Sequence, residues 1–243
     1  MAPAFTMPDR APLYAAPPFH YRGVRVVYAW AKARPEGIRR ALPPAFEPVG
    51  DMIQFFVMHT PDAGALGSYD EGGVVIPCRH GGLIGAHVAY EYVTSDDSLC
   101  VGREIWGYPK KLAEVGFSEE KGRICGTVSR RGQVLIDIGF EAGGAEVADK
   151  PAMQPRLQVK RIPRADGKGF DMDQIVRNDL KGAEFAETRY GACTVALGRN
   201  EDDPLDELGP IEVLGGEFAI ANFTLDYGTV LSDSVEARGA AAE

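Results

Sequence analysis

Several features that mark particular classes of protein are scarce or missing in this chain of 243 residues. No stretch approaches the roughly 20 consecutive apolar residues of a membrane-spanning helix, so no membrane partner is expected. The formal net charge of −9 provides no excess of positive charge, so a nucleic acid is not expected as a partner either. The first residues contain no basic segment followed by an apolar one, and a secretory signal is therefore not expected.

Cysteine is also scarce, and the four cysteines Cys78, Cys100, Cys125 and Cys193 form no Cys-x-x-Cys pair. In a chain of this size they are expected to be reduced core residues, and the protein is expected to be cytoplasmic. No glycine-rich phosphate loop precedes a helix, and no Gly-x-Ser-x-Gly nucleophile elbow is present. The chemistry that these motifs support is not indicated.

Histidine occurs only four times, which leaves few ligands for a metal ion. His80, His87 and Glu91 are the nearest approach to a ligand cluster. If residues 86–93 form a strand, His87 and Glu91 lie on the same face, because strand side chains alternate with a period of two. Their spacing matches no metal motif. Polar residues that line a barrel are the favoured interpretation, and no metal is expected.

What the sequence does contain is a succession of β-branched and aromatic runs of strand length. These runs cover residues 21–30, 52–60, 72–77, 86–94 and 217–231. Residues 122–140 predict two strands about a turn at Arg130–Gly132, and Asp166-Gly167 is the strongest hairpin signal in the chain. The pattern predicts a mainly β fold with many turns.

Helical signals are few, and they fall at residues 34–42 and 96–107. We therefore expect one mainly β domain with a few short helices over residues 19–235. Residues 1–18 are rich in Ala and Pro and are expected to form an arm on the surface or on a neighbouring subunit. Residues 236–243 are expected to be a flexible tail.

The segment GREIWGYPKKLAEVGF, residues 102–117, places Lys110 and Lys111 side by side among apolar residues. Adjacent lysines are most often part of a solvated turn. The other interpretation is a catalytic amine, which must be neutral to attack a ketone although a free lysine has a pKa of about 10.4. Burial or a neighbouring cation lowers that pKa by several units. Spacing does not decide between the two, because adjacent residues of a strand or a helix face apart.

GREIWGYPKKLAEV resembles the signature of the acetoacetate decarboxylase family, in which the first lysine of the pair forms a Schiff base with a ketone substrate. FHYRGVRVVYAW, LPPAFEP, SYDEGGVVIP, RLQVKRIPRADG and FTLDYG resemble further segments of the family, so the similarity covers about residues 18–235. The resemblance implies a large antiparallel β-barrel-like single domain, an enzyme of the carbon-carbon lyase class, and a homo-oligomer.

The resemblance also implies roles for individual residues. Lys110 matches the Schiff-base lysine, and Lys111 matches the cation that lowers its pKa. Arg22 matches an arginine near the substrate carboxylate, which a guanidinium binds through two parallel hydrogen bonds; the alternative is a surface arginine beside a strand. Glu71 matches the active-site glutamate of the family; the alternative is a loop carboxylate in a glycine-rich turn.

One position departs from the family pattern, because Phe56 stands where the family has a second carboxylate. An aromatic ring there suggests a more apolar pocket and a bulkier substrate. Phe56, Trp106 and Tyr108 are expected to contact the substrate. By excluding water from Lys110 they are expected to lower its pKa more than the charge of Lys111 does.

The expected function is decarboxylation of a β-keto acid, acetoacetate or a bulkier analogue, without a metal or an organic cofactor. Lys110 attacks the ketone and forms an iminium ion, which accepts the electron pair when CO₂ leaves. One alternative is an aldolase-dehydratase that uses the same lysine to condense pyruvate with an aldehyde. Another is a non-catalytic barrel that binds a small acid.

Overall fold

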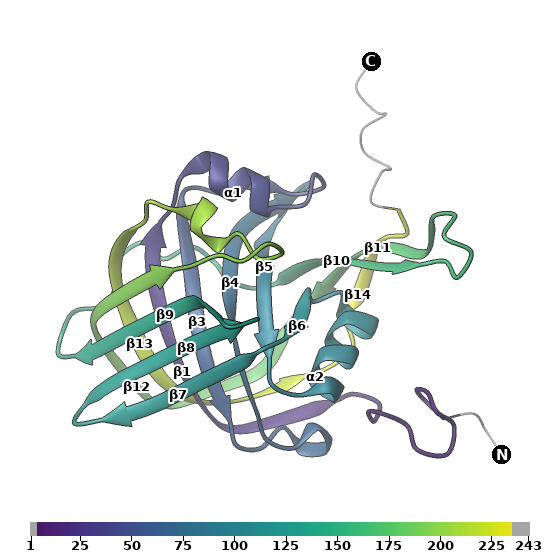
Figure 1. The fold of residues 1–243 in the computed structure, drawn as a ribbon, viewed down its shortest axis with the longest axis horizontal. Coiled ribbons are helices and arrows are strands. Elements are labelled where there is room, and N and C mark those ends of the chain that lie inside the picture. The colour runs from purple at the N-terminus through teal and green to yellow at the C-terminus, as the bar shows by residue number, and fades with distance from the viewer. Residues whose placement is uncertain (1–3, 235–243) are drawn as a thin grey trace.

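The computed structural model describes residues 4–234 and consists mainly of strands in a single 14-stranded sheet (Figure 1). The strands are β1 (Phe19–Lys32), β2 (Glu47–Pro48), β3 (Met52–Thr60), β4 (Tyr69–His80), β5 (Leu83–Val93), β6 (Lys110–Leu112), β7 (Glu114–Glu120), β8 (Arg123–Arg130), β9 (Gln133–Ala142), β10 (Arg156–Pro163), β11 (Phe170–Asn178), β12 (Leu180–Leu197), β13 (Glu212–Leu225) and β14 (Thr229–Ser232). The helices are α1 (Pro35–Ala41) and α2 (Asp96–Val101), the π-helical turn η2 (Gly102–Trp106), and the 3₁₀ turns η1 (Gly64–Leu66) and η3 (Leu205–Leu208).

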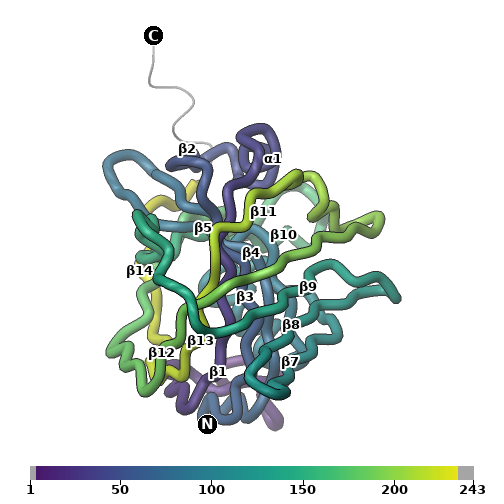
Figure 2. The backbone as a smooth tube through the Cα atoms, turned by 90° about the vertical axis from the view of Figure 1, so that its left-hand side faces the viewer, coloured from purple at the N-terminus to yellow at the C-terminus, as the bar shows by residue number. Residues whose placement is uncertain are grey.

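The strands follow the order β14-β11-β10-β5-β4-β3-β1-β13-β12-β9-β8-β7, with β2 against β4 and β6 against β5. Most pairs are antiparallel, while β5 pairs with both β6 and β10 in parallel. The sheet curls so that β7, β8 and β9 come round in front of β1 and β3 (Figures 1 and 2). The prediction of a mainly β, antiparallel fold is confirmed. In the described chain the two edge strands, β14 and β7, do not pair with each other. The sheet is therefore barrel-like but not closed.

The central strands β1, β3, β4 and β5 are buried on both faces. One face packs into a first core, to which Phe55, Phe140 and Phe218 belong. The other face packs into a second core, to which Tyr21 and Val88 belong. A strand with two buried faces requires a nearly continuous apolar run, and the sequence MIQFFVMHT of β3 provides one. The candidate site lies on the side of the second core.

A β-bulge in β5 decides which of its side chains reach the second core. Val74 of β4 pairs with Tyr90, but the next residue, Val75, pairs with Val88, so one extra residue stands in β5 between them. A bulge of this kind reverses which face the following side chains occupy. His87 and Glu91 therefore lie on opposite faces, and the prediction that they share one is wrong.

β12 is the longest strand, with 18 residues, and the sequence patterns did not indicate it. Its first half pairs only with β13, so its other edge is open, and residues 181–188 are exposed. Exposed edge residues need not alternate between apolar and polar types, which is why LKGAEFAET carries no strand signal. Phe185 in this half nevertheless lines the candidate site.

The two predicted helical regions are present as α1 and as α2 continued by η2. Residues 4–18 contain no strand up to Pro18, and the hydroxyl of Tyr14 donates a hydrogen bond to Glu104. Contact of this arm with a neighbouring subunit, and with it the homo-oligomer, stays a prediction. The expected tail at residues 236–243 lies outside the described residues. Between residues 4 and 234 no helix is both long enough and apolar enough to cross a membrane.

Gly73 of β4 is expected to be essential for packing beside the site. A Cβ atom added there would lie 2.2 Å from the carbonyl oxygen of Tyr90 and 3.1 Å from Cε1 of Phe56. Because the backbone oxygen cannot move without opening the pairing of β4 with β5, Gly73→Ala is expected to lower the free energy of unfolding by about 2 kcal/mol. Denaturant unfolding measures this free energy. Gly82→Ala is the matched control, because an added Cβ meets no atom within 4 Å there. Equal losses in both variants would contradict the prediction.

Candidate active site

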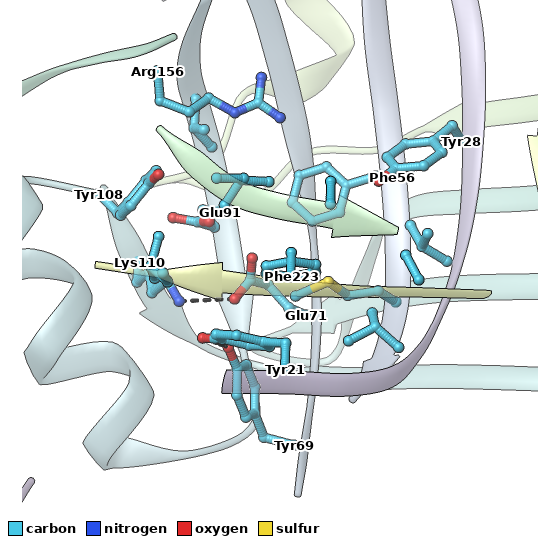
Figure 3. A pocket seen from close by; sticks show the side chains of 18 of the residues that line it. Tyr21, Tyr28, Phe56, Tyr69, Glu71, Glu91, Tyr108, Lys110, Arg156 and Phe223 are labelled. Atoms are coloured by element: carbon cyan, nitrogen blue, oxygen red, sulfur yellow. Dashed lines mark hydrogen bonds and ion pairs between the residues drawn. The ribbon is translucent and has the colours of Figure 1, made fainter. Parts of the chain in front are cut away.

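A cavity of about 120 Å³ lies on the second-core face of the central strands (Figure 3). Most of its wall is apolar and aromatic, with contributions from Phe56, Met58, Phe185 and Phe223 among others. The charged residues in the wall are Glu71, Glu91, Lys110 and Arg156. An apolar cavity with a few convergent polar groups is the usual form of a small-molecule site.

Lys110 enters the cavity from the short strand β6. The helical segment before it ends at Gly107, whose φ of +82° and close approach to Lys160 suit only glycine. β6 then runs parallel to β5, with Lys110 opposite Glu91. Lys110 is 5% exposed, and its Nζ donates hydrogen bonds to Glu71 Oε2 at 2.8 Å and to Ser98 Oγ at 3.0 Å. The amine is thus buried beside a carboxylate.

The charge state of Lys110 follows from two opposing effects. Burial disfavours the ammonium, but the carboxyl groups of Glu71 and Glu91 outweigh it, and the pKa of Lys110 is raised above its ordinary value. The prediction of a lowered pKa is therefore wrong for the protein without substrate. It took account of the burial but not of the two carboxyl groups that fold against the amine.

Lys111 has a different environment, because neighbouring residues of a strand face opposite sides. Its Nζ donates to Asp203 Oδ1 at 2.5 Å and to the carbonyl oxygen of Asp202 at 2.9 Å. Arg130 donates to the other oxygen of Asp203 at 2.9 Å, and the Asp203 side chain is fully buried. Lys111 does not line the cavity. The structure therefore does not support its expected role as the cation that lowers the pKa of Lys110.

Arg22 lies outside the cavity as well. A bulge in β1 shifts its pairing with β13 between Tyr21 and Val24, at Gly23, where φ is +64°. The Arg22 side chain is 61% exposed and forms an ion pair with Asp62 at 3.0 Å. The extra residue in β1 places the Arg22 side chain at the surface, so the structure does not support its expected role as the residue that binds the substrate carboxylate.

Arg156 is the arginine that lines the cavity, and sequence analysis did not identify it. It begins β10 and lies opposite Ala86 of β5, a pairing between segments 70 residues apart that no local pattern indicates. Its guanidinium donates to the carbonyl oxygen of Met153 at 2.7 Å. Between residues 4 and 234 no carboxylate forms an ion pair with it, so most of its donors remain for an anionic ligand.

Three of the remaining expected site residues line the cavity: Glu71, Phe56 and Tyr108. Glu71 lies within β4 and not in a loop. Trp106 is not part of the cavity wall. It is buried against Tyr108, with ring centroids 6.1 Å apart, and its Nε1 donates to the carbonyl oxygen of Asp226 at 2.9 Å. The structure therefore does not support the expectation that Trp106 contacts the substrate directly.

Glu91 was expected from the sequence to be a polar residue that lines a barrel, with a metal ligand as the alternative, and it lines the cavity. It is 4% exposed and forms a hydrogen bond with Glu71. Burial and the nearby charge of Glu71 raise the pKa of Glu91 well above its ordinary value. Its Oε2 atom is buried without a hydrogen-bond partner among the described residues. Its environment in the cavity wall thus favours the neutral form of Glu91.

The two histidines considered with Glu91 point elsewhere. Nδ1 of His87 lies 2.8 Å from the carbonyl oxygen of Leu157, and burial lowers the pKa of His87 to about 4. Nδ1 of His80 lies 3.1 Å from the carbonyl oxygen of Ala45. Over residues 4–234 no group of three or more His, Cys, Asp or Glu side chains is placed to hold a metal ion.

The contact of Lys111 with Asp203 predicts an effect on stability. Lys111→Met leaves the buried carboxylate with fewer donors and is expected to lower the free energy of unfolding by about 2 kcal/mol at pH 7. Although burial opposes it, the hydrogen bonds from Lys111 and Tyr92 lower the pKa of Asp203 below its ordinary 3.8. A lowered carboxyl pKa stabilises the fold above the unfolded-state pKa, and this contribution is lost as the pH falls through the folded-state pKa.

The difference between Lys111→Met and the wild type is therefore expected to shrink as the pH falls below the ordinary Asp pKa of 3.8, as denaturant unfolding at several pH values can show. A difference that stays constant down to pH 2 would mean that the pairing with Asp203 does not carry the effect.

Comparison with known proteins places the chain in a family. The family model described as acetoacetate decarboxylase matches residues 2–235. Acetoacetate decarboxylase 1 of Mesorhizobium japonicum is 28% identical over 235 residues, which is 95% of this chain and 94% of that protein. The acetoacetate decarboxylase of Ralstonia nicotianae is 27% identical over 235 residues, or 95% of each chain.

Solved structures share the fold. Acetoacetate decarboxylase from Legionella pneumophila superposes with a TM-score of 0.83 at 24% identity, over 91% of this chain and 90% of that one. The enduracididine biosynthesis enzyme MppR, solved in complex with pyruvate, gives a TM-score of 0.80 at 20% identity, over 96% and 99% of the two chains. With a family model that spans nearly its whole length, this chain belongs to the acetoacetate decarboxylase family.

Proposed function

We propose that the protein is a cofactor-independent lyase that decarboxylates a β-keto acid through a Schiff base on Lys110. The observation that carries the proposal is a buried lysine whose Nζ is 2.8 Å from a carboxylate inside an apolar cavity. The relatives named acetoacetate decarboxylase support the same reaction class.

The raised pKa of Lys110 requires a route to the neutral amine, and Glu71 provides one. The hydrogen bond between Nζ and Glu71 Oε2 is short enough for a proton to move along it. In a poorly solvated cavity the ion pair has little advantage over an amine beside a carboxylic acid, because two charges are costly to desolvate. Glu71 thus acts as the base that Lys110 needs, and no repulsion from Lys111 is required.

Arg156 takes the role of carboxylate binder that the sequence assigned to Arg22. Its side chain lines the same cavity as Lys110, and its donors are largely unused. A keto acid can then place its ketone at Lys110 and its carboxylate at Arg156. The remaining wall, with Phe56, Met58 and Phe223, suits an apolar substituent, so the substrate is a β-keto acid bulkier than acetoacetate.

The chemistry follows from these positions. The neutral amine of Lys110 adds to the ketone, and loss of water leaves an iminium ion. The carbon–carbon bond to the carboxylate then breaks, its electron pair moves into the iminium, and CO₂ leaves behind an enamine. Protonation of the enamine carbon and hydrolysis release the ketone and restore Lys110.

Two other functions share part of this site. An aldolase-dehydratase would use the same iminium ion, and MppR in complex with pyruvate shows that the fold accommodates that keto acid in a relative. A non-catalytic acid-binding protein would use the cations without forming a covalent bond. A single set of assays separates the three functions.

Borohydride added together with a β-keto acid is expected to trap a secondary amine on Lys110, visible as a mass increase of the peptide that contains it. The matched variants are Lys110→Met, expected to give no adduct, and Lys111→Met, expected to retain it. CO₂ release and condensation with added aldehydes are followed in the same samples. Condensation without CO₂ release would identify an aldolase, and no adduct with any keto acid would overturn Schiff-base catalysis.

Arg156→Met is expected to lower kcat/KM for β-keto acids by about 100-fold, since charge-assisted hydrogen bonds contribute about 3 kcal/mol. Trapping of a neutral ketone such as acetone on Lys110 is expected to persist, because acetone has no carboxylate for Arg156 to bind. Arg22→Met is the control and is expected to behave as the wild type. If the two arginine variants lose kcat/KM equally, Arg156 is not the carboxylate binder.

A further inference from the structure

Glu91 is a buried titratable group in the cavity wall that the proposed reaction has not yet used. Its place is fixed by the backbone, because β5 sets Glu91 directly opposite Lys110 of β6. Figure 3 shows its carboxyl group between Lys110 and Arg156, close to Glu71. The side chain is 4% exposed, and Oε2 has no hydrogen-bond partner within the described part of the chain.

The position of Glu91 matters because of where the reacting carbon must lie. In the proposed complex the iminium carbon is attached to Lys110 and the departing carboxylate is held by Arg156. The carbon that joins them, which becomes the nucleophilic carbon of the enamine, therefore spans the space between these two side chains. Glu91 borders that space.

We propose that Glu91 is the catalytic acid that donates a proton to the enamine carbon after CO₂ has left. The assignment rests on the proposed Schiff-base function and adds the residue that completes it. Glu71 is committed to Lys110, whereas Glu91 hydrogen-bonds Glu71 and keeps one oxygen without a partner. Two neighbouring carboxyl groups that share one proton provide a base and an acid in the same site.

The proton balance closes with these two carboxyl groups. Glu71 relays two protons from the Lys110 nitrogen to the ketone oxygen, one as the amine adds and one from the adduct, so that the oxygen leaves as water when the iminium ion forms. After CO₂ has left, the O–H bond of Glu91 breaks, and the C=C electron pair forms the new C–H bond. Hydrolysis restores the Lys110 ammonium, and Glu91 recovers one proton from solvent, which is the proton that decarboxylation of a keto acid consumes.

The other hydroxyl groups of the cavity are less suited to this step. The hydroxyls of Tyr21 and Tyr69 hydrogen-bond each other at 2.9 Å, and Figure 3 shows them on the far side of Lys110 from Arg156. The Tyr108 hydroxyl donates to Asn178 at 3.0 Å. Burial raises the pKa of these three tyrosines and of Tyr28, the fourth tyrosine of the cavity wall, so they hold their protons more firmly than a carboxyl group does.

The test separates imine formation from proton transfer to carbon. Acetone in D₂O exchanges its methyl protons only if the Lys110 imine forms and a protein group then moves a proton to and from the carbon, and ¹H NMR follows the loss of signal. Borohydride trapping of acetone on Lys110 reports the imine alone. Glu91→Gln keeps the shape of the side chain and removes its acidic proton. Glu114→Gln, at an exposed position of β7, is the matched control.

Glu91→Gln is expected to trap acetone on Lys110 at a rate close to wild type while its exchange rate falls by at least about 100-fold. Glu91→Asp keeps the acid one methylene group farther away and is expected to exchange faster than Glu91→Gln. If Glu91→Gln does not fold, slower exchange in Glu91→Asp with normal trapping carries the test.

Undiminished exchange in the Glu91 variants, or a parallel loss of trapping and exchange, would overturn the assignment of Glu91 and leave the Schiff base intact. Absence of trapping in the wild type would instead overturn the proposed function on which the assignment rests.

Discussion

A buried ammonium is stable only when a carboxylate shares its burial, and the pair of Lys110 with Glu71 imposes this constraint on the whole cavity. Moving each ion out of water costs several kcal/mol, so every other charge in the cavity wall must fit around the pair. For Glu91, burial and the charge of Glu71 raise the pKa and so favour the neutral form. Arg156 has no carboxylate among the described residues and adds one positive charge. Among the described residues Arg156 is thus the cation of the cavity wall without a carboxylate partner, which suits a ligand with one carboxylate.

Local patterns in the sequence were sufficient for the strand-rich fold and for singling out the segment that contains the buried Lys110. Burial on both faces gives β3 and β4 long apolar runs, and the motif around Lys110 is distinctive. His87 was placed wrongly because a single extra residue in β5 reverses its alternation. A similar extra residue in β1 lies next to Arg22, whose expected role came from the family resemblance and not from alternation. Gly23 lies at the bulge in β1, but a glycine in a strand does not by itself show where the alternation of inward and outward side chains is reversed.

Other features depend on contacts between distant parts of the chain. Arg156 reaches the cavity only because β10 pairs with β5, and the first half of β12 is a strand only because β13 lies beside it. The lysine pair is the opposite case, because a local rule, the alternation of side chains along a strand, was sufficient to place its two side chains. Adjacent strand residues face apart, so Lys110 enters the cavity while Lys111 binds Asp203 behind it. The family resemblance outweighed that rule in the interpretation of the sequence.

The two buried faces of the central strands bear on how such a protein diverges. Val26 and Tyr28 of β1 touch the cavity, whereas Val27 and Ala29 belong to the first core. Substitutions at alternate positions of one strand can therefore change the shape of the cavity without disturbing the packing of the first core. A lineage built on this sheet is free to acquire new substrates while its architecture persists, as a TM-score of 0.80 at 20% identity illustrates.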